Sequence, residues 1–424
     1  MTRVGEVQSP SSERTSPTRR GARVLTLDLG TSAVKAVLWQ REGIAALGRA
    51  PVVTRHPAPG WAEQDADSWL AAVHGALAQI DLDGVVALAF SSQRETTVCC
   101  HEDGTPLRPA ILWSDTRPED WVEREHPEVW ARTAWLAYPR DWVLHALTGE
   151  RASDPSIALL ARDEPRAKVA DLQPSTAVVG AWQGVPVVLG GGDRACEVLG
   201  TGATATAPMV SWGTTANLTV PGTHDVAGGR RSVGLHGEPL TELGLSGAGN
   251  VLGWLAALTG IDPGELSRLA ATAPAGRVRA LPYLAGARAP HWRSDVRATF
   301  AELDLTCGPA ELARAVYEGV AHDVRRCLAG IDGVTALSAA GGGADDTVWR
   351  TVVPAITRRA LQHRATSEAA SAGAALLAAE AIGLDWSLDE LNPLTDRDEP
   401  DVDLVAAYAV QAVAHDAFLA RTLS

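Results

Sequence analysis

The chain lacks the residue patterns of several large classes of protein. Its five cysteines are odd in number, two are adjacent, and no Cys-x-x-Cys pair occurs. This excludes a disulfide framework and a zinc site of ordinary spacing, and it favours a reducing cytoplasm. There is no Gly-x-Ser-x-Gly elbow and no Gly-x4-Gly-Lys-Ser/Thr loop. Any phosphate cradle must therefore be of another kind.

Long apolar runs and an excess of positive charge are also missing. Residues 1–21 are rich in Ser, Thr, Pro and Arg, which predicts a disordered tail, and no segment has the pattern of a signal peptide or a transmembrane helix. The net charge is −14 over 424 residues. So acidic a chain is a poor partner for nucleic acid or an anionic membrane surface, and we expect neither.

A short pattern near the start of the chain returns near its middle. Residues 25–39 are LTLDLGTSAVKAVLW and residues 208–220 are PMVSWGTTANLTV. Each has a Gly-Thr-Ser/Thr turn between two β-rich runs, which predicts two hairpins. Because such turns present N–H groups and hydroxyls to phosphate, we expect two halves facing one polyphosphate. For either copy alone, an ordinary hairpin turn is the alternative.

Asp28 precedes the first of these turns. A carboxylate beside phosphate is repulsive unless a cation bridges the two, so its position predicts Mg²⁺.

Apolar spacing along the rest of the chain predicts strands alternating with helices, and so an α/β protein with mixed sheets. Helices are expected over 139–149 and 310–331, and Pro354 should end or kink a third. Residues 97–113 predict a strand, an Asp-Gly turn and a second strand. The length favours two domains, which we place at 22–207 and 208–424 with a ligand cleft between them.

Three polar or glycine-rich segments follow predicted strands. QRET, residues 93–96, offers the donors and acceptors that a polyol or sugar requires. GGGD, residues 190–193, ends in Asp193, which can accept the proton of an attacking hydroxyl. GGGA, residues 341–344, can admit a flat group such as adenosine. Ordinary surface loops, with Arg94 paired to Glu95, are the alternatives that these residues leave open.

In this order, the segments resemble the FGGY carbohydrate kinases of the sugar kinase/Hsp70/actin superfamily. The resemblance covers about residues 23–385 and includes LDLGTS, SSQRETTV, GGGDRACEVLGTG, SWGTT and GGGADDTVWR. It implies two ribonuclease-H-like (actin-like ATPase) domains with mixed sheets flanked by helices and an active-site cleft between them. It also implies transfer of the γ-phosphate of ATP to a hydroxyl of a small sugar or polyol, with Mg²⁺.

The resemblance implies a role for each matching residue. Asp193 would be the general base for the acceptor hydroxyl, and Asp28 and Asp193 would be the carboxylates at the metal. The phosphate and adenosine contacts would be Gly30, Thr31, Ser32, Gly213, Thr214, Thr215, Gly341, Gly342 and Gly343. The acceptor contacts would be Gln93, Arg94, Glu95, Trp113, Asp115, Asp193 and Arg194.

The acceptor itself stays open, because the segments resemble two subfamilies. SSQRETT is similar to glycerol kinases, whereas GGGDRACEVLGTG and GGGADDTVWR are more similar to xylulose kinases. The chain is also shorter than typical members, with losses after Arg117 and between Leu160 and Gly184. A pocket that lacks part of its wall could take a larger substrate. The alternative function is a nucleotide-binding regulatory or interaction protein that has lost sugar phosphorylation, and a homodimer also stays open.

Overall fold

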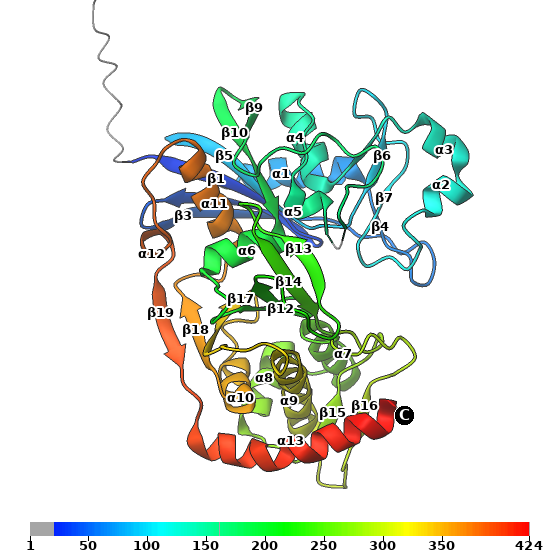
Figure 1. Ribbon diagram of the computed structural model, residues 1–424, viewed down its shortest axis with the longest axis vertical. Coiled ribbons are helices and arrows are strands. Elements are labelled where there is room, and N and C mark those ends of the chain that lie inside the picture. The colour runs from blue at the N-terminus through cyan, green and yellow to red at the C-terminus, as the bar shows by residue number, and fades with distance from the viewer. Residues whose placement is uncertain (1–20, 161, 424) are drawn as a thin grey trace, which may run out of the picture.

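Two mixed β-sheets organise the computed structural model, which describes residues 21–160 and 162–423 (Figure 1). Residues 1–20, within the predicted tail, lie outside this description. The first sheet has the order β3-β2-β1-β5-β10-β9, and the second has the order β13-β14-β12-β11-β17-β18-β19. In the first sheet three antiparallel strands, β3, β2 and β1, are followed by the parallel strands β5 and β10. In the second sheet four antiparallel strands, β13, β14, β12 and β11, are followed by the parallel strands β17 and β18. The repeat seen in the sequence is therefore the repeated centre of two sheets.

The strands of the two sheets alternate with the helices along the chain. The first sheet contains β1 (Arg23–Leu29), β2 (Ala33–Gln40), β3 (Gly43–Pro51), β5 (Val85–Ser92), β9 (Val178–Trp182) and β10 (Val185–Gly192). The second contains β11 (Met209–Trp212), β12 (Ala216–Pro221), β13 (Arg230–Val233), β14 (Pro239–Gly244), β17 (Ala336–Ala340), β18 (Ala360–Arg364) and β19 (Leu394–Asp398). Short pairs are formed by β4 (Glu63–Gln64), β6 (Val98–Cys100), β7 (Ala110–Ile111), β8 (Trp135–Ala137), β15 (Arg279–Leu281) and β16 (Thr299–Ala301).

The helices cover the faces of these sheets. In the first half they are α1 (Ala66–Leu77), α2 (Trp121–Glu125), α3 (Pro127–Arg132), α4 (Pro139–Thr148), α5 (Pro155–Ala158) and α6 (Asp193–Thr201). In the second half they are α7 (Gly249–Thr259), α8 (Pro263–Thr272), α9 (Pro309–Leu328), α10 (Thr347–Thr357), α11 (Ala369–Ala381), α12 (Leu388–Leu391) and α13 (Val402–Leu423). Both predicted hairpins and the predicted helices at 139–149 and 310–331 are confirmed.

Strand β1 is apolar almost throughout because both faces of its sheet are covered. Leu25 and Leu27 pack into the core on the α1 side of the sheet, while Val24 packs into the core on the other side. Successive side chains of a strand point to opposite faces, so a strand covered on both faces must be apolar throughout.

The second core of the first sheet also joins the two halves. It contains side chains from β1 and β2, from α6 and α11, and from β11 and β17. Gly200 of α6 faces the backbone of Ala369, and Gly373 of α11 faces the backbone of Cys196, so a Cβ at either glycine would clash. These small residues let the two helices pack closely against each other.

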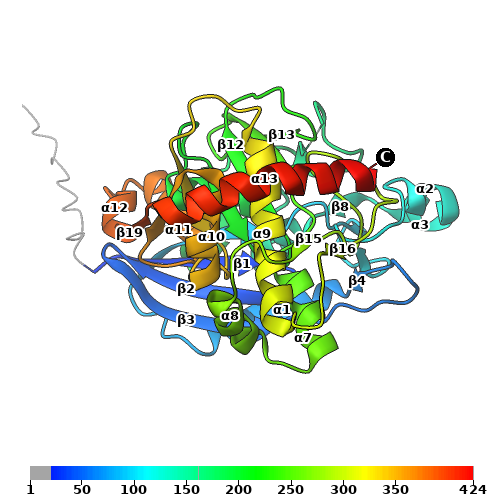
Figure 2. The same ribbon diagram turned by 90° about the horizontal axis from the view of Figure 1, so that it is seen from below.

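Helix α13 departs from the sequence prediction. Among the described residues it is the one helix that is long and apolar enough to cross a membrane by length and composition alone. Figure 2 shows it lying across α9. There Arg314 donates to the Tyr408 hydroxyl at 2.8 Å, that hydroxyl donates to Glu318 at 2.6 Å, and Arg325 donates to Asp416 at 2.5 Å. These contacts make α13 part of the packing of the second half.

One other prediction was wrong in part, and one was confirmed. Pro354 does not end its helix, because α10 continues to Thr357. The segment 97–113 forms the predicted strand, turn and strand, and its two arms are joined by Ile111 N donating to Thr97 O at 3.0 Å and Leu107 N donating to Cys99 O at 2.8 Å. Each arm also pairs with a further strand, β6 with β8 and β7 with β4. Local pattern did not indicate these additional partners.

Candidate active site

The two Gly-Thr-Ser/Thr turns face one cavity between the halves. This cavity has a volume of about 190 Å³ and is lined by Thr31 from the first turn and by Thr214 and Thr215 from the second. Each turn is closed by its own backbone, with Gly30 N donating to Ala33 O at 3.1 Å and Gly213 N donating to Thr215 O at 3.2 Å.

Side chains from elsewhere in the first half support the first turn. Trp113 Nε1 donates to Thr31 Oγ1 at 2.9 Å, and Thr31 Oγ1 donates to Gln93 Oε1 at 3.1 Å. Thr96 Oγ1 donates to the same amide oxygen at 3.1 Å. Gln93 is buried, so its amide fixes the hydroxyl of Thr31 as well as lining the cavity.

The second turn is supported by the start of α7. Gly249 N donates to Gly213 O at 3.2 Å, and Asn250 N donates to Thr214 O at 2.8 Å. The side chain of Asn250 accepts from Ala248 N at 3.0 Å and from Val251 N at 2.9 Å. The amino end of a helix and its free N–H groups favour an anion nearby.

Asp193 begins α6 directly after the buried strand β10. Its Oδ1 accepts from Arg194 N at 2.7 Å and from Arg94 Nε at 3.1 Å. Within the described residues nothing bonds the other oxygen, Oδ2, and the side chain is 33% exposed at the cavity. One oxygen is therefore fixed and the other is left to a ligand. Gly192 allows this approach, because a Cβ there would clash with the side chain of Arg94.

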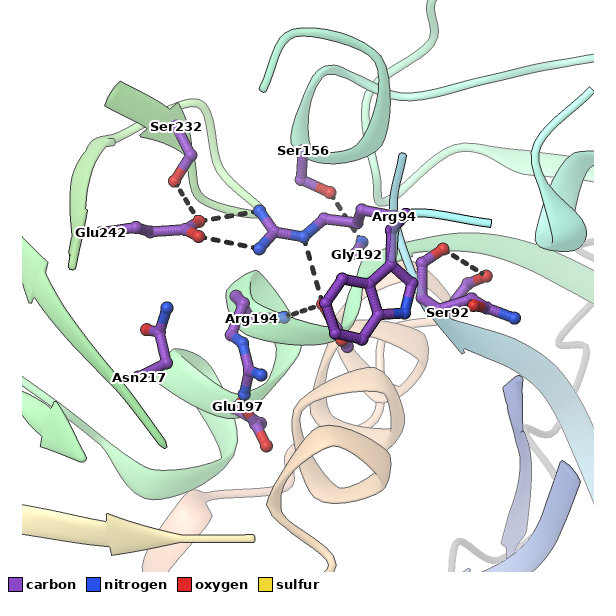
Figure 3. A network of polar contacts seen from close by, with 12 residues as sticks. Ser92, Arg94, Ser156, Gly192, Arg194, Glu197, Asn217, Ser232 and Glu242 are labelled. Carbon is purple, nitrogen blue, oxygen red and sulfur yellow. Dashed lines mark hydrogen bonds and ion pairs between the residues drawn. The ribbon is translucent and has the colours of Figure 1, made fainter. Parts of the chain in front are cut away.

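Arg94 connects the two halves across the cavity, as Figure 3 shows. Its Nη1 and Nη2 donate to the two oxygens of Glu242 at 2.7 and 2.8 Å. Ser232 Oγ donates to Glu242 as well, at 2.5 Å. Burial would raise the pKa of Glu242, but the guanidinium holds it below its usual value. Two of the five N–H groups of Arg94 stay available to a ligand.

The neighbouring Glu95 does not pair with Arg94. Its backbone has φ +59°, and its half-exposed side chain lies 3.9 Å from Arg230. It lines the cavity together with Trp113. The alternative of a surface loop with a self-paired Arg94 is therefore wrong.

Asp115 is placed differently from the other predicted acceptor contacts. It accepts from Ala62 N at 2.6 Å and from the guanidinium of Arg117 at 2.6 and 2.9 Å. Although burial opposes it, the bond from Arg117 lowers the pKa of this carboxyl. Asp115 lines a second, larger cavity rather than the smaller one. Its role in the structure is to hold Arg117.

Arg194 lies on the second-half side of the cavity. It donates to Glu197 at 2.5 Å and to Ser211 at 3.0 Å, and Ser211 in turn donates to Glu197 at 2.9 Å. This network ties α6 to β11, next to the second turn.

Asp28 lies at the end of β1, where Lys35 approaches to 3.9 Å and bonds Glu368 at 2.6 Å. Burial raises the pKa of Asp28 to about 6, Lys35 opposes this rise, and Glu368 and Asp193 add to it. Among the described residues no three carboxylate, His or Cys side chains cluster as a metal site. Mg²⁺, which binds through one or two carboxylates plus water and phosphate oxygens, does not need such a cluster, so Asp28 with Asp193 fits it.

The glycine triplet follows β17 and lies against Trp212. Gly341 has φ +79°, and a Cβ there would be 2.6 Å from Trp212 O. Gly342 faces open space. None of Gly341, Gly342 and Gly343 lines the 190 Å³ cavity, so the predicted adenosine position lies apart from the predicted acceptor position.

Several residues of the cavity were missed in the sequence. These are Asn217, Arg230, Glu242, Arg288 and Trp292. All come from the second half, and Arg230 and Glu242 stand in no short motif. Arg288 and Trp292 belong to the stretch LPYLAGARAPHWRSDVR, which has charged and aromatic residues in a Gly/Pro-rich loop, and that composition was a usable signal.

The larger cavity, about 770 Å³, shares part of its lining with the smaller one. The shared residues are Glu95, Trp113, Leu160 and Arg230. Arg117, Pro118, Leu160 and Arg162, which flank the two stretches where losses were predicted, also line it. The larger cavity therefore lies beside the two stretches of chain that the resemblance predicted to be shortened.

Comparison with known proteins agrees with these features. A model of the FGGY family of carbohydrate kinases, N-terminal domain, matches residues 23–124, and the model of its C-terminal domain matches residues 198–382. The chain is 30% identical to a xylulose kinase of Escherichia coli over 90% of this chain and 95% of that relative. It is 31% identical to a glycerol kinase of Thermus brockianus over 77% and 83%. The first alignment extends over 467 residues, more than the 424 of this chain, so the chain lacks segments that this relative has.

Solved structures show the same fold. A xylulose kinase from Lactobacillus acidophilus superposes with a TM-score of 0.85 at 18% identity, over 95% of this chain and 99% of that one. A Plasmodium falciparum glycerol kinase with ADP gives 0.81 at 18% identity, over 95% and 98%. These likenesses confirm the predicted fold, two actin-like ATPase domains with mixed sheets flanked by helices.

Proposed function

Because the chain belongs to the FGGY family of carbohydrate kinases, we propose that it transfers the γ-phosphate of ATP to a hydroxyl of a small sugar or polyol, with Asp193 as general base. The observation that carries this proposal is the convergence of both phosphate turns and Asp193 on one cavity. Relatives named xylulose kinase and glycerol kinase support the acceptor class.

The two turns would hold the phosphates of ATP from opposite sides. Thr215 offers a hydroxyl, and Thr31 would donate to phosphate on exchanging its bond to Gln93. The start of α7 behind Thr214 adds a favourable field for negative charge. Gly341, Gly342 and Gly343 would lie against adenosine, next to Trp212. Bound in this way, the γ-phosphate would point toward Asp193.

Asp193 would take the proton of the acceptor hydroxyl through Oδ2. Its Oδ1 is held by Arg94 and by the backbone of Arg194, which fixes the orientation of the carboxylate. The free N–H groups of Arg94 and the carboxylate of Glu95 would contact other hydroxyls of the acceptor. Positioning of this kind supplies much of the catalysis of phosphoryl transfer.

Asp28 and Asp193 would hold Mg²⁺, either directly or through water. The bound ion would neutralise negative charge on the phosphates. Burial and the neighbouring carboxylates raise the pKa of Asp28 to about 6, because they disfavour its ionised form. A divalent cation beside Asp28 would offset the cost of this negative charge.

ADP release with a panel of polyols, ketoses and aldoses tests the proposal. Stimulation by at least one hydroxyl compound is expected. No stimulation by any compound, with ATP still bound, would contradict it and would favour a nucleotide-binding regulatory protein. We do not favour that alternative, because Asp193 and both phosphate turns keep one shared cavity.

A further inference from the structure

We propose that the acceptor carries an anionic group, a carboxylate or a phosphate, which Arg230 and Arg288 bind beside the indole of Trp292. This rests on the proposed function, since it names a class of acceptor for the same cavity. All three residues line that cavity, and none of them is among the predicted phosphate, adenosine, metal or acceptor contacts.

The two arginines converge on one ring. The guanidinium carbon of Arg230 lies 4.7 Å from the centroid of the Trp292 indole, and that of Arg288 lies 5.5 Å from it. Arg230 begins β13, whereas Arg288 lies in the loop between β15 and β16, so the fold brings them together from distant parts of the chain. Stacking on an aromatic ring orients a guanidinium while leaving its N–H groups free for an anion.

The charge on this pair is not balanced by the protein. Within residues 21–160 and 162–423, the guanidinium of Arg288 makes no ion pair and no hydrogen bond, and Arg230 has only Glu95, at 3.9 Å. Burial and the nearby Arg230 lower the pKa of Arg288. The other arginines of the cavity are neutralised, Arg94 by Glu242 and Arg194 by Glu197. An anionic ligand would supply the missing negative charge.

The ring between the arginines is held in an unfavourable backbone conformation. Trp292 has φ +49°, which a bulky side chain rarely adopts, and its Nε1 donates to Gly228 O at 2.9 Å. Glu95, on the other side of Arg230, has φ +59°. Strain at two residues of one site persists only where the surroundings enforce it, and this is typical of ligand-binding positions.

The position of Arg230 favours the acceptor over ATP as the source of the anion. Arg230 and Glu95 line both cavities, so they stand where the acceptor cavity opens into the 770 Å³ space. An acceptor whose hydroxyl reaches Asp193 could therefore extend its anionic end toward Arg230, with room beyond for further carbons. The phosphates of ATP, by contrast, already have binding partners in the two Gly-Thr-Ser/Thr turns.

The test compares matched acceptors in an ADP-release assay on the full chain with Mg²⁺ and ATP. Five- and six-carbon polyols are paired with the corresponding aldonates and with polyol phosphates, which distinguishes a carboxylate from a phosphate. The variants are Arg288→Met, Arg230→Met and Arg288→Lys. Arg231→Met is the matched control, because Arg231 is exposed on the same strand and lines neither cavity. Binding of each anion without ATP is measured in parallel by calorimetry.

We expect one anionic class to exceed its neutral counterparts in kcat/KM. Arg288→Met and Arg230→Met should raise KM and Kd for that class about tenfold or more, as loss of a charged hydrogen bond does, and leave neutral acceptors and Arg231→Met nearly unchanged. Arg288→Lys should restore part of the binding.

Two results would overturn the proposal: a preference for neutral acceptors that Arg288→Met does not alter, or an equal rise in the KM of ATP with every acceptor. Anion binding that depends on Arg288, without turnover of any acceptor, would support the anion site and contradict the kinase proposal. Turnover of neutral acceptors without any anion binding would support the kinase proposal and contradict the anion site.

Discussion

Arg94 and Glu242 form a bidentate ion pair between the two halves of the molecule, with N–O distances of 2.7 and 2.8 Å. Their side chains are only 9% and 7% exposed, so the pair is nearly removed from water. The same guanidinium holds Asp193 at 3.1 Å. One residue of the proposed acceptor site thus positions the proposed base and connects the two halves of the chain.

Breaking this pair from one side should be costly. Glu242→Ala leaves the charge of Arg94 buried and is expected to destabilise the protein by about 3–5 kcal/mol, measured by urea unfolding. The double variant Arg94→Met with Glu242→Ala should lose much less than the sum of the two single variants, because neither member of this ion pair is then left buried without the other. Strictly additive losses would mean that the two side chains do not interact.

The glycine triplet offers a pair of substitutions that separates folding from binding. Gly341→Ala places a Cβ 2.6 Å from Trp212 O at a residue with φ +79°, so we expect a loss of about 1–3 kcal/mol in stability. Gly342→Val has open space in the structure and should leave the melting temperature nearly unchanged.

If adenosine lies against this turn, Gly342→Val should nevertheless raise the KM of ATP severalfold. An unchanged KM of ATP in a normally folded Gly342→Val would place the nucleotide base elsewhere.

The pKa of Asp28, raised to about 6 by burial, predicts a pH dependence of nucleotide binding. The folded state holds this proton more tightly than the unfolded chain, so the carboxyl stabilises the fold most below about pH 4, and this contribution falls as pH rises to about 6. Mg²⁺ requires the ionised form. The thermal stabilisation by Mg²⁺ and ATP should therefore weaken as pH falls through about 6.

Asp28→Asn should weaken this stabilisation above about pH 6, where Asp28 is ionised, and should flatten its dependence on pH in this range. Asp385→Asn, at an exposed carboxylate that does not line the cavity, is the control and should behave as the wild type. A wild-type pH profile in Asp28→Asn would exclude Asp28 from the metal site.

The sequence predicted what depends on local pattern and missed what depends on pairing over long distances. The two hairpins, the turns at Thr31 and Thr214 and the position of Asp193 at the end of a strand follow from residues close together in the chain. The partner of Arg94 does not, because Glu242 is 148 positions away and stands in the buried strand β14 without a motif.

The same limit explains the other misses. Arg230 and Arg288 meet only because β13 and the loop after β15 fold against Trp292, and the positive φ of Trp292 leaves no trace in its residue type. Pro354 could stay within α10 because it lies in the last turn of that helix, where tertiary packing outweighs local preference.

Substitution of Asp193 by Asn tests the central claim most directly. The change keeps the size of the side chain and removes the base, so acceptor-dependent ADP release should fall by at least about a thousandfold. ATP binding, measured by calorimetry on the same variant, should survive. Wild-type turnover in Asp193→Asn would contradict the account, since no other carboxylate of the cavity is placed to replace Asp193 beside both phosphate turns.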